Sequence, residues 1–247
     1  MIHFIWLTEP ENSSAFGKGR PFSFINMLAV KAAAQFYDGK IWMWCNEEPK
    51  NNSNWMSIKH LVKIIKVTPP DYIGDAALNY IQYKSDVLRL QILLEHGGIY
   101  LDTDHLLLKP LDSLVGKRLV LAKASSGSYA MSPIIAEPGS EFIKAWLKEI
   151  PEEIKKGIWA SHAVVLPVKI AENYECDVRP REEFFPFDLE DYYLFDESKV
   201  SEYEKNMKDV YGVHIYETFW QGYLEHINEM YVKTSDTLFA KLFRHLV

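Results

Sequence analysis

One segment constrains the fold more than any other: a helical pattern that ends at two glycines and passes directly into a short apolar strand. Between residues 79 and 96, apolar side chains recur along one helix face at Tyr83, Val87, Leu90 and Leu94. Gly97-Gly98 ends the pattern, because glycine readily takes the left-handed conformation in which helices stop. Ile99-Tyr100-Leu101 follows as a strand and runs into Asp102-Thr103-Asp104. The chain therefore places two carboxylates at the end of a buried strand.

The elements before this segment alternate between strand and helix. Apolar runs at residues 2–6, 40–45 and 61–67 have the length of buried strands. A helix is expected to begin at Pro21, between the first two runs, and a shorter one around Trp55, between the second and third. This order predicts an α/β fold with a mostly parallel sheet and helices on both faces. In such sheets ligands bind outside the carboxyl ends of the strands, which is where the acidic pair lies.

The second half of the chain has a less regular pattern. Strands are expected at residues 118–122 and 132–136, and a helix over residues 139–156. Three aromatic-rich segments are expected as short strands, at residues 184–187, 192–195 and 213–216. The C-terminus has an amphipathic helical pattern from Ser235, which could dock on a membrane surface or pack onto the domain.

Composition and charge argue against several classes of function. The 247 residues carry a formal net charge of −7, and no run of Lys and Arg could follow a phosphate backbone, so we expect no nucleic-acid partner. Cys45 and Cys176 match neither a disulfide framework nor zinc-ligand spacing. No apolar run approaches the roughly 18 to 20 residues that span a bilayer, and residues 1–6 lack the basic start of a secretory signal. We expect a soluble, cytoplasmic protein, held at the inner face of the membrane if the C-terminal helix docks there.

The acidic pair has the chemistry of a metal site. Asp102 and Asp104 alternate along an extended segment, so their side chains share one face. Two hard oxygen ligands on one face suit Mg²⁺ or Mn²⁺, and either ion leaves positions for diphosphate oxygens and water. Such a cation acts as a Lewis acid on a departing phosphate. An acidic protein that binds a nucleotide diphosphate also needs this local positive charge.

The same segment resembles a known family. The run Lys84-Ser85-Asp86-Val87-Leu88-Arg89, followed by Gly97 to Asp104, is similar to the motif of the sugar-binding-region glycosyltransferases. These include yeast initiating mannosyltransferases, bacterial capsule enzymes and, more distantly, the clostridial glucosylating toxins. The similarity extends to residues 2–6 and loosely to His214 with Trp220. It implies a GT-A (Rossmann-like) nucleotide-sugar-binding fold and retention of the anomeric configuration.

The resemblance also implies roles on the donor side. Trp6 would stack on the nucleobase, and Tyr100 would border the sugar. Asp86 and Arg89 would hold sugar hydroxyls and nearby phosphate oxygens, while Asp102 would face the ribose and the sugar. We therefore expect one domain over residues 1–247, with the nucleotide-sugar part at about 1–122 and the acceptor-side part, including the C-terminal helix, at about 123–247.

On the metal side, the resemblance implies that Asp104 ligates the cation directly, with Asp102 beside it. His214 would be the third protein ligand, because a C-terminal His or Asn completes the metal shell in several retaining enzymes of this fold. Trp220 would form a wall of the diphosphate site. Asp86, Arg89, Asp102 and Asp104 are thus the expected catalytic residues.

Each position also admits a purely structural role. Asp86 and Arg89, at i and i+3 of a helix, could form an exposed ion pair. Trp6 could belong to the core, and His214 could be an ordinary hydrogen-bonded histidine. His162 could contact an acceptor, although a helix-capping segment is the simpler interpretation.

The expected function is transfer of a hexosyl unit from a UDP- or GDP-sugar to an acceptor hydroxyl, on a surface polysaccharide, lipopolysaccharide or lipid-linked glycan. Alternatives are an effector-like enzyme that glucosylates a protein and a nucleotide-sugar-binding module without turnover. A nucleotidyltransferase is disfavoured, because it usually needs a basic, Gly-rich phosphate loop near the first strand. The only candidate for such a loop in the sequence is Gly17-Lys18-Gly19-Arg20, within a polar loop from Thr8 to Arg20.

Overall fold

The structure is a computed structural model that describes residues 1–8, 21–125 and 127–247. The sequence predicts a polar loop over residues 8–20. Residues 9–20 of this loop, which include Gly17-Lys18-Gly19-Arg20, lie outside the described residues.

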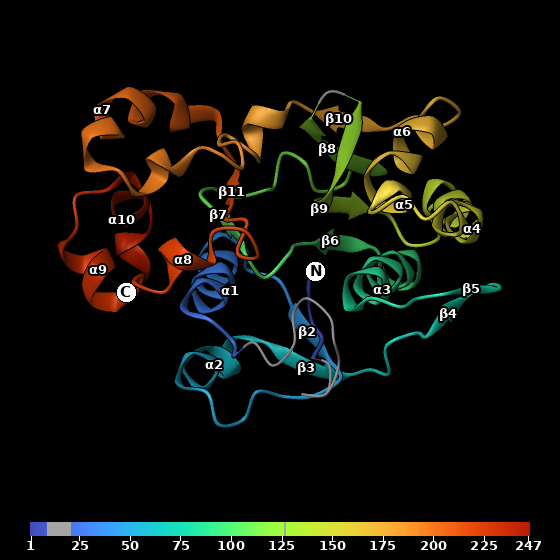
Figure 1. The fold of residues 1–247 in the computed structure, drawn as a ribbon, viewed down its shortest axis with the longest axis horizontal. Helices are drawn as coiled ribbons and strands as arrows, with labels where there is room; N and C mark the ends of the chain where they lie inside the picture. The colour runs from blue at the N-terminus through green and yellow to red at the C-terminus, as the bar shows by residue number, and fades with distance from the viewer. Residues whose placement is uncertain (9–20, 126) are drawn as a thin grey trace.

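A central sheet of seven strands organises the described part of the chain (Figure 1). Its strands, in spatial order, are β10 (Asp177–Arg179), β8 (Leu119–Ser125), β9 (Ser128–Ala136), β6 (Gly98–Tyr100), β1 (Ile2–Trp6), β2 (Ile41–Cys45) and β3 (Lys63–Lys66). Strand β9 is antiparallel to both of its neighbours, and the other neighbouring strands are parallel. The mostly parallel sheet predicted from the sequence is confirmed. It continues past residue 122, so the two expected parts of the chain share one sheet.

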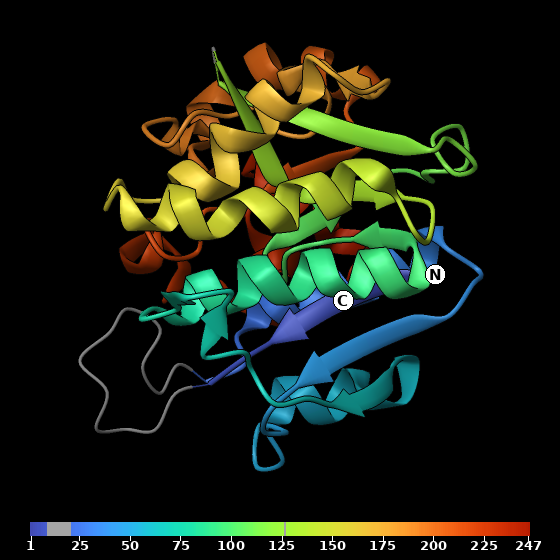
Figure 2. The same cartoon turned by 90° about the vertical axis from the view of Figure 1, so that its right-hand side faces the viewer.

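Helices cover both faces of this sheet, as predicted. Helices α1 (Phe24–Phe36) and α2 (Ser53–Ile58) pack with one cluster of buried apolar residues, and α3 (Ile81–His96) and α4 (Glu141–Lys155) with another. Successive side chains along a strand point into opposite clusters: in β6, Ile99 belongs to the first cluster and Tyr100 to the second. Figure 2 shows α3 and α4 lying together over one face.

Local sequence explains where the two best-marked helices begin and end. Helix α1 begins at Phe24 rather than at Pro21, because the Ser23 hydroxyl accepts a hydrogen bond from the Asn26 backbone and the Asn26 side chain accepts one from Ser23. Helix α3 ends at Gly97, whose φ is 62°. At the next residue, Gly98, a Cβ atom would lie 2.5 Å from the Met1 carbonyl oxygen, so both glycines are required.

Two small antiparallel ladders complete the strands. Strands β4 (Tyr72–Ile73) and β5 (Ala76–Ala77) form one. Strand β7 (His105–Leu107) pairs with β11 (Gly212–His214) in the other, which places His214 opposite His105. The strand predicted at residues 213–216 is thus confirmed in its first part. This second ladder places residues 212–214 beside the segment that directly follows Asp102-Thr103-Asp104.

The other two aromatic-rich segments are not strands, contrary to the prediction. Residues 184–187 have no regular structure, and Pro186 in their middle has no backbone N–H to donate to a ladder. Tyr192–Phe195 is the 3₁₀ helix η3. Side chains three residues apart align in such a helix, and the rings of Tyr192 and Phe195 both contact Trp220.

Short helices form most of the rest of the chain. They are α5 (Ser161–Val164), α6 (Leu166–Ala171), α7 (Val200–Tyr203), α8 (Gln221–Leu224), α9 (Glu229–Thr234) and α10 (Leu238–Phe243). The remaining 3₁₀ helices are η1 (Lys59–Leu61), η2 (Arg181–Glu183), η4 (Glu197–Lys199), η5 (Glu204–Asp209) and η6 (Arg244–Leu246).

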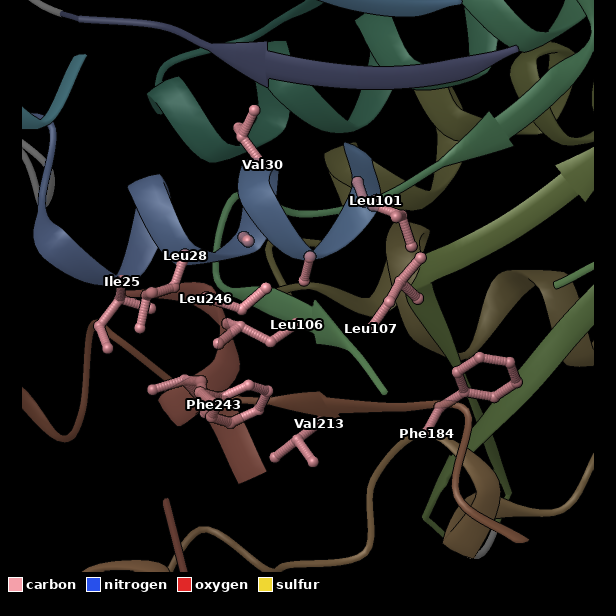
Figure 3. Packing of buried hydrophobic residues seen from close by; sticks show 14 of the residues in the cluster. Ile25, Leu28, Val30, Leu101, Leu106, Leu107, Phe184, Val213, Phe243 and Leu246 are labelled. Atoms are coloured by element: carbon pink, nitrogen blue, oxygen red, sulfur yellow. The ribbon is translucent and has the colours of Figure 1, made fainter. Parts of the chain in front are cut away.

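The C-terminal amphipathic helix packs into the core. It is shorter than predicted, covering α10 and η6, and its apolar residues Leu238, Phe239, Phe243 and Leu246 are buried. Figure 3 shows Phe243 and Leu246 facing Leu106 and the side chains of α1. The stripe is therefore used in packing. Within residues 1–8, 21–125 and 127–247, no helix has the length and apolar character that crossing a bilayer requires.

Candidate active site

A pocket of about 360 Å³ opens where β1 and β6 end. The start of α3, the β6–β7 connection and the segments around Ala160 and Glu217 complete its walls. Six of the residues predicted from the sequence line it: Trp6, Asp86, Arg89, Tyr100, Asp102 and Asp104. Positions that are up to 98 residues apart in the chain thus meet at the predicted edge of the sheet.

Asp102, Asp104 and His214 lie together in this region. One potential ligand atom from each lies within 4.8 Å of the other two. The Nε2 atom of His214 is 3.4 Å from an Asp104 carboxylate oxygen and 3.8 Å from one of Asp102. The β7–β11 ladder causes this proximity, and it is extended by a hydrogen bond from the Ile215 N–H to the Asp104 carbonyl oxygen. Two carboxylates and an imidazole form a donor set that suits a divalent cation.

The electrostatics of the three residues favour a cation among them. Burial alone would lower the pKa of His214, but the Asp104 and Asp102 carboxylates outweigh burial and raise this pKa. Burial would likewise raise the pKa of Asp102, but Arg89, His214 and Tyr100 together hold it well below its usual range. Asp102 is thus ionised, and the site attracts positive charge. Binding a metal through His214 requires the imidazole to lose its proton.

Asp102 is fixed by partners on three sides. One carboxylate oxygen accepts hydrogen bonds from Arg89 at 2.9 Å and from the Tyr100 hydroxyl at 2.8 Å. The Asp102 backbone N–H donates to the Ser132 hydroxyl at 2.8 Å, and that hydroxyl lies 3.2 Å from Nδ1 of the buried His105. The other carboxylate oxygen faces His214 and remains available as a ligand.

Arg89 is the centre of a buried charge network. Its guanidinium contacts the Asp86 carboxylate at 3.1 Å and the Asp102 carboxylate at 2.9 Å. It also lies 4.4 Å from the centre of the Tyr100 ring and donates a hydrogen bond to the Met131 carbonyl oxygen. Burial would lower its pKa, but the surrounding negative groups raise it above its usual value. Asp86 and Arg89 do form an ion pair, but the interpretation that this pair is exposed is wrong, because only 8% of Asp86 and 6% of Arg89 is exposed.

His162 is a site residue whose position the sequence left open. It is buried in α5, and its Nε2 lies 3.1 Å from the second carboxylate oxygen of Asp86. Its ring packs edge-on against Tyr83 at 4.3 Å, and its carbonyl oxygen accepts a hydrogen bond from the Trp146 indole. Asp86 is thus held from one side by Arg89 and from the other by His162.

Sequence reasoning missed two further polar residues. Asn26 is fully buried in α1 and donates to Glu217 and to the Thr103 carbonyl, both at 3.0 Å. The Glu217 backbone N–H donates to the Asp104 carboxylate at 3.0 Å, and Glu217 lines the pocket. A polar Asn on the buried face of a helix was the available signal, because buried amides need partners.

The two predicted tryptophans occupy different positions. Trp6 is half-buried in the pocket wall, 5.1 Å edge-on from Phe22. Trp220 is fully buried and does not line the pocket: its indole donates to the Leu189 carbonyl, and its ring lies 5.2 Å from Tyr216. Tyr216 has a φ of 49° and donates its N–H to His214. Trp220 therefore supports the turn that carries His214.

Comparison with known proteins finds one matching family model and several related glycosyltransferases. Residues 26–121 match the family model described as "Glycosyltransferase sugar-binding region containing DXD motif". The chain is 28% identical to Glucan organizing enzyme 1 of Cryptococcus neoformans var. grubii, over all of this chain and 70% of that protein. It is 25% identical to human Lactosylceramide 4-alpha-galactosyltransferase, over 56% of this chain and 42% of that one.

Two solved structures share the fold. The glycosyltransferase GlyE of Streptococcus pneumoniae TIGR4 aligns with a TM-score of 0.54 at 12% identity, over 99% of this chain and 59% of that one. PaToxG Glycosyltransferase aligns with a TM-score of 0.50 at 16% identity, over 99% and 85%. The predicted GT-A fold is confirmed.

Proposed function

We propose that this protein is a metal-dependent, retaining hexosyltransferase, because residues 26–121 match the model of the glycosyltransferase sugar-binding region that contains a DXD motif. It transfers a hexosyl unit from a UDP- or GDP-sugar to an acceptor hydroxyl. The observation that carries the proposal is the meeting of Asp102, Asp104 and His214 beside the buried Asp86–Arg89 pair. The metal triad suits a diphosphate, and the adjoining polar groups suit a sugar.

Asp102, Asp104 and His214 would hold Mn²⁺ or Mg²⁺, whose charge supplies electrostatic stabilisation of the departing diphosphate. Arg89 and Tyr100 keep Asp102 ionised and fixed in orientation through their hydrogen bonds. The Glu217 N–H fixes the orientation of the Asp104 carboxylate, and the Asn26 amide in turn positions Glu217. Rigid ligands reduce the reorganisation that binding and transfer require.

The donor would lie across the pocket floor. Trp6 presents an aromatic wall for the nucleobase, and Asp86 accepts hydrogen bonds from sugar hydroxyls while Arg89 and His162 fix its carboxylate. Tyr100 borders the sugar. Retention follows from the family resemblance, and either front-face attack or double displacement is compatible with these residues.

For the acceptor, we favour a glycan hydroxyl on a surface polysaccharide, lipopolysaccharide or lipid-linked glycan, in a cytoplasmic enzyme. The names of the related proteins, a glucan organizing enzyme and a lactosylceramide galactosyltransferase, support a glycan or glycolipid over a protein acceptor. The likeness to PaToxG, at 16% identity, is one of fold and adds no support for a protein acceptor.

A donor screen tests the proposal. UDP or GDP release from a panel of nucleotide sugars is measured with Mn²⁺ or EDTA, for the wild type and the Asp104→Asn variant. Manganese-dependent release from one donor, abolished in the variant, is the expected result. If no donor is cleaved with any metal, and UDP or GDP with Mn²⁺ gives no thermal stabilisation, the transferase proposal is wrong and a non-catalytic role replaces it.

A further inference from the structure

An exposed aromatic group lies next in the chain to residues that line the donor pocket, outside the residues assigned above. Trp159 is 55% exposed and Tyr80 is 41% exposed, although aromatic rings of this size are usually largely covered. Each is a direct neighbour in the chain of a pocket-lining residue, Ala160 and Ile81 respectively. The two rings are therefore attached to the chain one residue from the pocket lining, at the start of α3 and just before α5.

The rings are held in fixed orientations. Tyr80 and Trp159 pack edge-on with centroids 5.1 Å apart, and the buried Tyr83 contacts both, at 5.1 and 5.2 Å. Edge-on and tilted contacts of this kind are the favourable geometries for aromatic rings. A platform that is ordered before a ligand arrives loses little conformational freedom on binding.

The backbone at this point is also constrained. Ala160 has a φ of 56°, in the left-handed region that a non-glycine residue seldom takes. The turn separates Trp159, which faces outward, from His162, which is buried against Asp86. Strained residues of this kind cluster at functional sites. One ring, Tyr83, touches both Trp159 and His162, so the platform and the Asp86 anchor are joined through direct contacts.

We infer that Trp159 and Tyr80 form the acceptor subsite and stack on the apolar face of a pyranose ring. The inference rests on the proposed transferase function. A sugar ring presents C–H groups on its face and hydroxyls at its edge, so it matches an exposed aromatic surface beside a polar pocket. Stacking there directs an edge hydroxyl of the acceptor toward the donor sugar held at Asp86.

Local charge favours a sugar over a bilayer as the occupant. The nearby lysines are paired with carboxylates, Lys84 with Asp71 at 2.7 Å and Lys155 with Asp75 at 2.8 Å. A surface that docks on anionic lipid instead carries an excess of unpaired basic residues. A neutral, rigid platform suits an uncharged glycan.

Saturation-transfer NMR tests the subsite directly. The probes are lactose, maltose, cellobiose and the methyl glycosides of glucose, galactose and mannose, each with UDP and Mn²⁺ present. The wild type should bind at least one of them, and Trp159→Ala and Tyr80→Ala should each weaken that binding roughly tenfold, the loss expected for a central aromatic contact. Trp159→Phe, which keeps an aromatic face, should recover most of it.

The control variant is Tyr223→Ala, which removes another exposed aromatic ring whose neighbours in the chain, Gly222 and Leu224, do not line the donor pocket. It should bind the sugars as the wild type does. Circular dichroism confirms that each variant is folded, and two separate platform variants protect against the failure of one to fold.

Two outcomes would overturn the subsite. One is unchanged sugar binding in both platform alanine variants. If Trp159→Ala binds sugars normally but no longer sediments with phosphatidylcholine vesicles, the platform is a membrane contact and the subsite is likewise wrong. The other is a wild type that hydrolyses a nucleotide sugar but binds no probe. Because donor hydrolysis by the wild type is measured independently, failure of the subsite is distinguished from failure of the transferase proposal.

Discussion

Arg89 balances the charges of two carboxylates that folding largely removes from water. Asp86 and Asp102 come from a helix and from a strand end, and both contact the same guanidinium. Removing one member of a buried charge group is costly, because the remaining charges lose their partner while staying buried. Arginine suits this position since its planar fork reaches two carboxylates and the Met131 carbonyl together.

The Arg89→Met variant should therefore lower the free energy of unfolding by about 3–5 kcal/mol. Lys84→Met is the matched control on the same helix, because its partner Asp71 is largely exposed, and it should cost less than about 1 kcal/mol. Urea unfolding followed by circular dichroism measures both. Similar losses in the two variants would contradict the buried network.

His162 should act as a positioning residue for Asp86. His162→Leu should reduce kcat for donor hydrolysis roughly 10- to 100-fold, because a small displacement of the Asp86 carboxylate, proposed above to hold the donor sugar, lowers the rate of transfer strongly. His162→Gln, which can still donate to Asp86, should recover part of kcat. A change in stability with no change in kcat would assign His162 a structural role alone.

At the scale of elements, how well each part of the site could be predicted depends on how far apart its residues lie in the sequence. Helix α3, its glycine stop and the Asp-x-Asp strand end form one local pattern, so their positions could be predicted from spacing. His214 reaches Asp104 only through the β7–β11 ladder, which joins residues more than 100 positions apart. Its placement as third ligand came from a family resemblance, and the contacts of His162 and Glu217 depend on long-range packing that periodicity does not encode.

His3 joins three elements and should make stability depend on pH. Its Nε2 bonds to the Gly97 carbonyl at the end of α3, and its Nδ1 accepts from Trp44 of β2, so the ring is held neutral. Burial lowers its pKa to about 4, from 6.5 in the unfolded chain. The unfolded state therefore binds a proton in this range that the folded state does not.

Consequently, His3 should reduce the free energy of unfolding as pH falls from about 6.5 to about 4, by roughly 3 kcal/mol in total. Above pH 6.5 the effect should vanish. Urea unfolding of the wild type and His3→Gln at several pH values isolates this contribution as a difference in slope. Parallel curves for the two proteins would show that His3 does not titrate as described.

For the whole molecule, strand and helix alternation predicted the central sheet and its two covered faces. Residues 184–195 resisted prediction, because they form irregular and 3₁₀ structure, where neither the strand nor the helix period applies. Within this segment, Tyr192 and Phe195 pack against Trp220. The C-terminal helix closes the same cluster. The two parts expected from the sequence therefore share a core, and ligand binding should stabilise the chain as a unit.

Saturating UDP with Mn²⁺ should thus raise the thermal midpoint of the wild type by several degrees, since binding at about 100 times Kd contributes ~2.7 kcal/mol. UDP with EDTA should raise it much less. Differential scanning calorimetry measures the shift, and equal shifts with and without metal would argue against coupled binding of nucleotide and cation.

Direct titration of Mn²⁺ by electron paramagnetic resonance is the most direct test of the metal-dependent site. The wild type should bind one ion per chain, and Asp104→Asn and His214→Ala should each weaken binding at least roughly tenfold, while Lys84→Met should leave it unchanged. The same affinity in all four proteins would contradict the assignment of Asp102, Asp104 and His214 as the metal ligands, and with it the account of how this enzyme holds its donor.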